Sequence, residues 1–162
     1  MTKGALYRHY KSKRDIFDSI VKRMEQQDSE QARENEVPEE SIEKTPEEYQ
    51  NVSFDDFVEY SKSMFEYWTE DDFASSFRKM LTIEQFRSEE MQKLYQQYLV
   101  AGPASYVKAL FESIGIVNAK DKAARFYAVM HFYYSLYDGA ADKEKVKVEF
   151  VSAIKSLVQD LA

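Results

Sequence analysis

The spacing of apolar residues along the chain predicts helices. Ile16, Phe17, Ile20, Val21 and Met24 recur every three or four residues, which forms one apolar stripe on a helix over 12–27. The same period predicts further helices over 53–68, 71–87, 89–115, 119–137 and from 142 onward. No segment shows the strict alternation of apolar and polar residues that is typical of strands. We therefore expect an all-α fold.

Capping and helix-breaking residues place the helix ends. Ser88, Asn118 and Asp142 each precede an apolar run and are residue types that cap helix N-termini. Gly115 is expected just past a helix C-terminus, where glycine tolerates the left-handed conformation. The Gly102-Pro103 pair should break or kink the stretch 89–115, because proline removes a backbone donor and crowds the preceding turn.

The segment from Glu25 to Glu48 differs from its surroundings. It holds ten acidic and two basic residues, few apolar groups, and both Pro38 and Pro46. Such a composition cannot bury enough apolar surface to form a core of its own, so it predicts a solvated connection.

Large and soft side chains are concentrated in the middle of the chain. The sequence is 15% aromatic, with 12 Tyr, 11 Phe and 1 Trp, but has only 4 Gly and 3 Pro. Eight Met and aromatic residues could line a cavity between helices: Met64, Phe65, Trp68, Phe77, Met80, Phe86, Tyr95 and Tyr98. For each of them, plain core packing is the alternative interpretation.

Charge is unevenly distributed. Residues 1–24 carry a net charge of +5 and the whole chain −7, so the remaining residues carry −12. A basic end on an acidic body is typical of a protein whose basic end faces a polyanion. The chain has no cysteine, no signal-peptide core and no apolar run long enough for a membrane span. We expect a soluble, cytoplasmic protein without a metal or other cofactor.

The first 17 residues contain a specific pattern. Thr2-Lys3-Gly4-Ala5-Leu6-Tyr7-Arg8-His9-Tyr10-Lys11-Ser12-Lys13 is followed by Arg14-Asp15-Ile16-Phe17. This segment resembles the recognition helix and the following helix of the TetR family of transcriptional regulators. The order of the helices after it is also similar to the effector-binding body of that family.

The resemblance implies a role for each matching residue. Lys3, Gly4 and Ala5 would lie near base edges in the major groove, because the N-terminal end of a recognition helix enters the groove. Tyr7, His9 and Lys13 would contact the phosphate backbone. Residues 1–27 would then be part of a helix-turn-helix domain, and 28–162 an effector-binding and dimerisation domain.

The family also implies two partners besides operator DNA. One is a hydrophobic or amphipathic small molecule that binds among the middle helices, moves the helix over 12–27 and so changes the spacing of the two recognition helices, commonly to relieve repression. The other is a second copy of the chain, held through the last two helices. The expected homodimer contacts come from seven residues: Phe126, Met130, Tyr133, Phe150, Ile154, Leu157 and Leu161.

Two alternatives remain open. Family members carry two further helices before the recognition helix, and this sequence starts after that point. The chain could therefore be a headless protein that binds a ligand or pairs with full-length paralogues without binding DNA. An enzyme is the other rival, but His9 and His131 are the only histidines and no nucleophile or metal motif occurs. We expect no catalysis, and His131 is expected to be a hydrogen-bonded core or interface residue.

Overall fold

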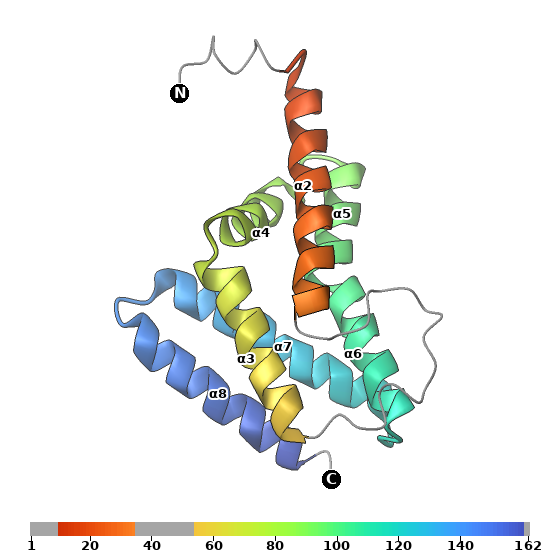
Figure 1. Ribbon diagram of the computed structural model, residues 1–162, viewed down its shortest axis with the longest axis vertical. Coiled ribbons are helices and arrows are strands. Elements are labelled where there is room, and N and C mark those ends of the chain that lie inside the picture. Colours follow the sequence, from red (N-terminus) through yellow and green to blue (C-terminus); the bar gives the residue numbers. More distant parts are fainter. Residues whose placement is uncertain (1–9, 35–53, 161–162) are drawn as a thin grey trace. The chain divides into compact units, whose positions relative to one another are not determined.

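The computed structural model describes residues 10–34 and 54–160, and its described parts are helical without any strand (Figure 1). The predicted all-α fold is confirmed. The chain divides into two compact units, residues 1–41 and 42–162. The first contains α2 (Lys13–Glu34), and the second contains α3 (Phe54–Glu70), α4 (Asp72–Glu84), α5 (Glu89–Leu99), α6 (Ala101–Ser113), α7 (Ala119–Gly139) and α8 (Lys143–Gln159).

Helix α2 begins where the sequence predicts, and a capping arrangement explains its start. The Ser12 hydroxyl accepts a hydrogen bond from the Asp15 amide at 3.1 Å, and the Asp15 carboxylate accepts one from the Lys11 amide at 2.8 Å. The helix continues seven residues beyond the predicted end at 27 and reaches Glu34. The acidic composition suggested a connection there, but the stretch contains no Gly or Pro and is rich in Glu, Gln, Ala and Arg, which favour helix.

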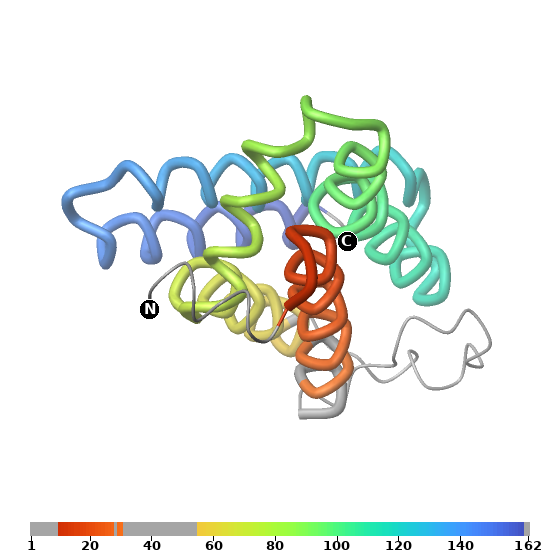
Figure 2. The backbone as a smooth tube through the Cα atoms, turned by 90° about the horizontal axis from the view of Figure 1, so that it is seen from above, coloured from red at the N-terminus to blue at the C-terminus, as the bar shows by residue number. Residues whose placement is uncertain are grey.

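In the second unit, α3, α7 and α8 pack together around an aromatic core. Figures 1 and 2 both show α8 alongside α7, and α3 contacts both of them. The Phe65 ring on α3 stacks on Phe150 of α8, with 4.2 Å between ring centroids, and meets the Tyr137 ring of α7 edge-on. Helix α6 packs along α7, and α4 packs on α3 and α5.

The expected interruption near Gly102-Pro103 lies two to three residues earlier. Helix α5 ends at Leu99, α6 begins at Ala101, and Val100 between them has the non-helical angles φ −140° and ψ −84°. Pro103 has no amide hydrogen to give to the Leu99 carbonyl four residues before it. That carbonyl instead accepts a hydrogen bond from the Tyr127 hydroxyl of α7 at 2.9 Å, so the break also fixes α7 against α5.

The turn between α6 and α7 follows the prediction at one end and departs from it at the other. Gly115 has φ +79°, and the Ile116 amide donates to the Phe111 carbonyl at 2.9 Å, which is the hydrogen bond of a glycine-terminated helix end. Asn118 was expected to cap α7 with its side chain, but it makes no such bond. It has φ 58°, a left-handed conformation that asparagine adopts more readily than most residues.

Ser88 and Asp142 cap α5 and α8 as predicted, each accepting a backbone amide hydrogen bond within three residues. Over the part of the chain described here, no helix is both long enough and apolar enough to cross a membrane.

Candidate functional site

The predicted DNA-contact residues fall mostly outside the described residues. Lys3, Gly4, Ala5, Tyr7 and His9 all lie there. Lys13 is the first residue of α2 and is exposed. Its ammonium group is therefore available at the positive N-terminal end of that helix.

The structure places the eight predicted pocket residues on α3, α4, α5 and the turn between α4 and α5. Phe65 belongs to the core with Phe150, whereas Phe77 of α4 meets the Tyr98 ring of α5 edge-on at 5.2 Å. Trp68 and Tyr95 are buried, and Met64 and Met80 are half-buried.

Phe86 cannot be a lining residue of an enclosed cavity in this chain. It lies in the turn between α4 and α5 and is 86% exposed. Phe86 was predicted to lie on the same helix as Phe77 and Met80, over 71–87, but α4 ends at Glu84 and Phe86 lies beyond it.

Most of the predicted dimer-contact residues are buried within one chain. Phe126, Met130, Phe150 and Ile154 are at most 5% exposed, which leaves them no surface for a partner. Tyr133 and Leu157 are half-buried, and Leu161 lies outside the described residues. Helix α7 has apolar residues on two sides. The side that was predicted to contact a second copy is buried in the core of the single chain.

The other apolar side of α7 is exposed. Phe132 and Leu136, one helical turn apart, are 60% and 38% exposed, and Val148 on the adjoining α8 is 70% exposed. We call these three residues the outer face of α7–α8. Small exposed residues, Ala128, Ser135 and Ser152, occur on the same two helices and would let another helix approach closely.

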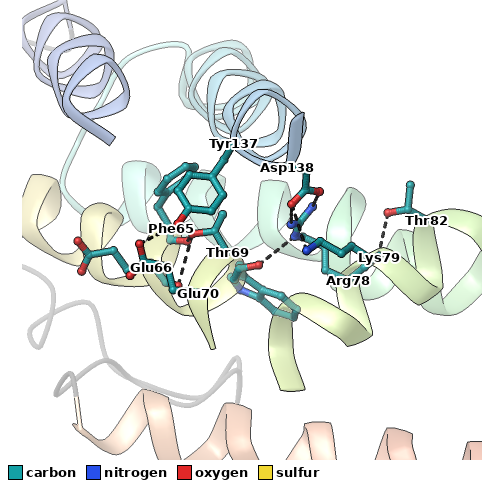
Figure 3. A network of polar contacts seen from close by, with 10 residues as sticks. Phe65, Glu66, Thr69, Glu70, Arg78, Lys79, Thr82, Tyr137 and Asp138 are labelled. Carbon is teal, nitrogen blue, oxygen red and sulfur yellow. Dashed lines mark hydrogen bonds and ion pairs between the residues drawn. The ribbon is translucent and has the colours of Figure 1, made fainter. Parts of the chain in front are cut away.

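A buried ion pair joins α4 to the end of α7 (Figure 3). The Arg78 side chain is 6% exposed, and its two terminal nitrogens donate to the two carboxylate oxygens of Asp138 at 2.9 and 2.7 Å. Its Nε donates to the Trp68 carbonyl in the last turn of α3 at 2.9 Å, and its guanidinium lies over the Tyr134 ring. One side chain thus connects α3, α4 and α7.

The charge of Asp138 is maintained by these contacts. Burial raises the pKa of its carboxyl, but the hydrogen bonds and charge of Arg78, with a smaller contribution from Lys79, lower the pKa below its ordinary value. The Lys79 ammonium lies 3.5 Å from the same carboxylate and is about half exposed.

A second polar bridge joins the end of α3 to α7 and α8. The Tyr137 hydroxyl donates to the Glu70 carboxylate at 2.9 Å, and the Lys147 ammonium lies 3.0 Å from the same oxygen. The hydrogen bond from Lys147 is the main reason that the Glu70 pKa is lowered. Burial, together with the Glu70 hydrogen bond, raises the pKa of Tyr137 to about 12.

A third polar cluster lies between α5 and α7. His131 Nε2 is 3.2 Å from the Tyr95 hydroxyl, and the Tyr95, Tyr127 and Tyr134 rings all meet the imidazole edge-on or at a steep angle. Burial and the positive charge of Arg78 lower the pKa of His131, and burial raises those of Tyr127 and Tyr134. These shifts favour the neutral forms of His131, Tyr127 and Tyr134 beside a paired guanidinium.

Sequence reasoning anticipated a hydrogen-bonded His131 but missed Arg78 and Asp138. A signal for Arg78 was present, because Ala74, Phe77, Arg78 and Leu81 occupy one face of α4, all of it buried. A lone arginine within an apolar stripe indicates a buried partner. Nothing in the sequence identified that partner as Asp138, 60 residues away.

Within the described ranges, no group of three or more His, Asp and Glu residues could hold a metal ion. No family model, no curated protein and no solved structure matches the chain.

Proposed function

We propose that the chain is a ligand-responsive, DNA-binding transcriptional regulator of the TetR type, with 1–27 contributing to the DNA-reading end and the remainder forming a small-molecule-sensing, dimerising body. The observation that carries the proposal is the motif Thr2–Phe17. The capped start of α2 at Lys13, within that motif, supports it, because a helix-turn-helix needs its next helix to begin there.

DNA binding is tested by selecting sites from random duplexes with the purified chain and measuring affinity at several salt concentrations. Lys3→Ala should relax sequence preference and cost about 1–3 kcal/mol if Lys3 contacts a base. Lys13→Ala should weaken binding to all DNA sequences alike. It should also reduce the magnitude of the slope of log affinity against log salt concentration by about 1, the amount expected for one lost phosphate contact. Failure to enrich any sequence, with salt-independent background binding, would reject this proposal and favour the headless alternative.

The homodimer is proposed through the outer face of α7–α8 rather than through the residues expected from the sequence. Phe132, Leu136 and Val148 are exposed apolar side chains on two adjacent helices, which makes them candidates for an interaction surface. A two-fold interface needs one self-complementary patch per chain. Sedimentation equilibrium should show a dimer for the wild type and a monomer for Phe132→Glu.

Phe86→Glu is the matched control for that experiment. Phe86 is the same residue type and even more exposed, but it lies in the turn between α4 and α5. A wild-type monomer, or equal weakening by both substitutions, would count against the outer face of α7–α8 as the dimer contact.

Small-molecule sensing is tested by thermal denaturation with a panel of lipophilic compounds. A ligand that binds only the folded chain raises the unfolding midpoint by an amount that grows with the logarithm of the ligand concentration once this exceeds the dissociation constant. A compound that stabilises the chain and releases selected DNA would support the regulator. Stabilisation without release would support a binding protein that does not regulate transcription.

A further inference from the structure

We propose that Tyr95 and His131 form a pH-sensitive joint, which holds α5 against α7 while the imidazole is neutral and loosens that contact when the imidazole takes up a proton. This inference concerns the stability of the helical body and does not depend on the proposed function.

The geometry of the pair makes it a connection between helices. His131 lies near the middle of α7 and Tyr95 near the middle of α5, and their side chains meet at 3.2 Å. The Tyr127 hydroxyl, one turn before His131 on α7, donates to the Leu99 carbonyl at the end of α5. These two hydrogen bonds tie α7 to two points of α5 about one helical turn apart.

Burial and the charge of Arg78 favour the neutral form of the imidazole and outweigh a backbone hydrogen bond of His131 that raises its pKa. Arg78 of α4 supplies a positive charge that acts on it, while Tyr95 of α5 and Tyr127 and Tyr134 of α7 supply phenol rings. Tyr60 of α3 contributes electrostatically to the raised pKa of Tyr134. The carboxylate that pairs with this Arg78, that of Asp138, is engaged by both terminal nitrogens of the guanidinium.

Protonation changes both the hydrogen bond and the charge. A neutral imidazole can accept the Tyr95 hydroxyl proton at Nε2, but an imidazolium has donors only. The Tyr95 hydroxyl would then have to receive a hydrogen bond and turn its own proton elsewhere. A second cation would also stand near Arg78 in a half-buried place, where like charges repel more strongly than in water.

The direction of the pH effect follows from linkage. Because burial and Arg78 hold the pKa of His131 below 6.5, the unfolded chain binds a proton more readily than the folded one. The neutral His131 side chain makes its full contribution to folding stability at pH values above its pKa in the unfolded chain. That contribution is lost as the pH falls from there through its pKa in the folded chain. Each pH unit that separates the folded from the unfolded pKa of His131 changes the folding equilibrium constant by up to about tenfold.

The test combines proton titration with hydrogen exchange. The chain has only two histidines, so imidazole NMR resonances can be assigned with His9→Gln, which removes the other titration. We expect His131 to titrate below pH 6.5. We also expect amide exchange in α5, corrected for the intrinsic pH dependence, to accelerate several-fold between about pH 7.5 and 5.5.

Two variants separate the joint from general acid destabilisation. His131→Gln retains a hydrogen-bonding side chain but cannot titrate, so its α5 exchange should lose the pH-dependent acceleration that His9→Gln keeps. Tyr95→Phe removes the hydroxyl alone and should accelerate α5 exchange already at pH 7.5. Titration of His131 at or above 6.5, or identical pH profiles for wild type and His131→Gln, would overturn the proposal.

Discussion

Single side chains join helices that are far apart in the sequence. Arg78, Tyr127 and Tyr137 each donate from one helix to an acceptor on another. Since these groups are buried or partly buried, losing one partner leaves the other without its hydrogen bond in a place that water reaches poorly.

Asp138→Ala should destabilise the chain by about 3 kcal/mol, because it leaves the nearly buried Arg78 charge without its carboxylate. Urea unfolding measures the change. The control is Lys79→Ala, which removes the half-exposed cation from the same carboxylate and should cost no more than about 0.5 kcal/mol. A similar loss of unfolding free energy in both variants would show that the bidentate Arg78–Asp138 pair stabilises the fold no more than the Lys79 contact does.

The Arg78–Asp138 pair also predicts an acid-dependent loss of stability. The folded pKa of Asp138 is lowered, so its contribution is present above the unfolded value of 3.8 and disappears as the pH falls through the folded pKa. Asp138→Asn should therefore unfold with a shallower acid dependence than the wild type in pH titrations followed by circular dichroism. An unchanged acid profile would contradict the assignment.

Tyr127→Phe should cost about 1–2 kcal/mol, because the Leu99 carbonyl loses the donor that replaces the missing Pro103 amide. Chemical denaturation of this variant beside Tyr133→Phe, a half-buried tyrosine on the same helix, gives the comparison. If the two variants lose the same stability, the carbonyl does not need that hydroxyl.

At the scale of the helices, the break between α5 and α6 shows how local and tertiary causes combine. Pro103 makes an interruption necessary, but the position of that interruption depends on a close backbone contact. A Cβ added at Gly102 would lie 1.9 Å from the Gln97 carbonyl oxygen, far inside van der Waals contact. Only a residue without Cβ lets the two helices meet at this angle.

Gly102→Ala should accordingly destabilise by about 1–3 kcal/mol, since the backbone must shift to admit the methyl group. Gly139→Ala is the matched control: nothing lies within 4 Å of its added Cβ, and it should be neutral or stabilise by up to about 1 kcal/mol. Thermal unfolding of both variants measures the two changes in stability. If Gly102→Ala is as stable as the wild type, the backbone at the break between α5 and α6 can shift to admit the methyl group.

At the scale of the whole molecule, the second unit contains its own aromatic core and its own interhelical ties. Phe57, Phe111 and Phe126 form one ring cluster near the start of α3, and Phe65, Tyr134, Tyr137 and Phe150 form another further along it. Both clusters lie within the second unit, and a core of its own is what a unit needs to fold independently.

Residues 42–162 alone should therefore fold into a cooperative helical domain. Its near-UV circular dichroism should retain the signals of packed aromatic rings, and urea should unfold it in a single transition. A molten, non-cooperative product with helix but no near-UV signal would contradict this division of the chain.

The sequence by itself determined the helical class and many of the helix ends, because these depend on local chemistry. Apolar period, the caps Ser88 and Asp142, and the left-handed Gly115 act within a few residues of where they stand. The sequence also contained the motif on which the proposed function rests.

Only the tertiary structure decided which of the apolar sides faces inward and which charges meet. Helix α7 has two such sides, and packing against α3, α6 and α8 buried the side of Phe126 and Met130 while leaving Phe132 exposed. Arg78 and Asp138 are 60 residues apart, as Glu70 and Tyr137 are 67 apart, so no local pattern connects them. Periodicity defines the faces of a helix, but the neighbours that cover each face depend on how the whole chain folds.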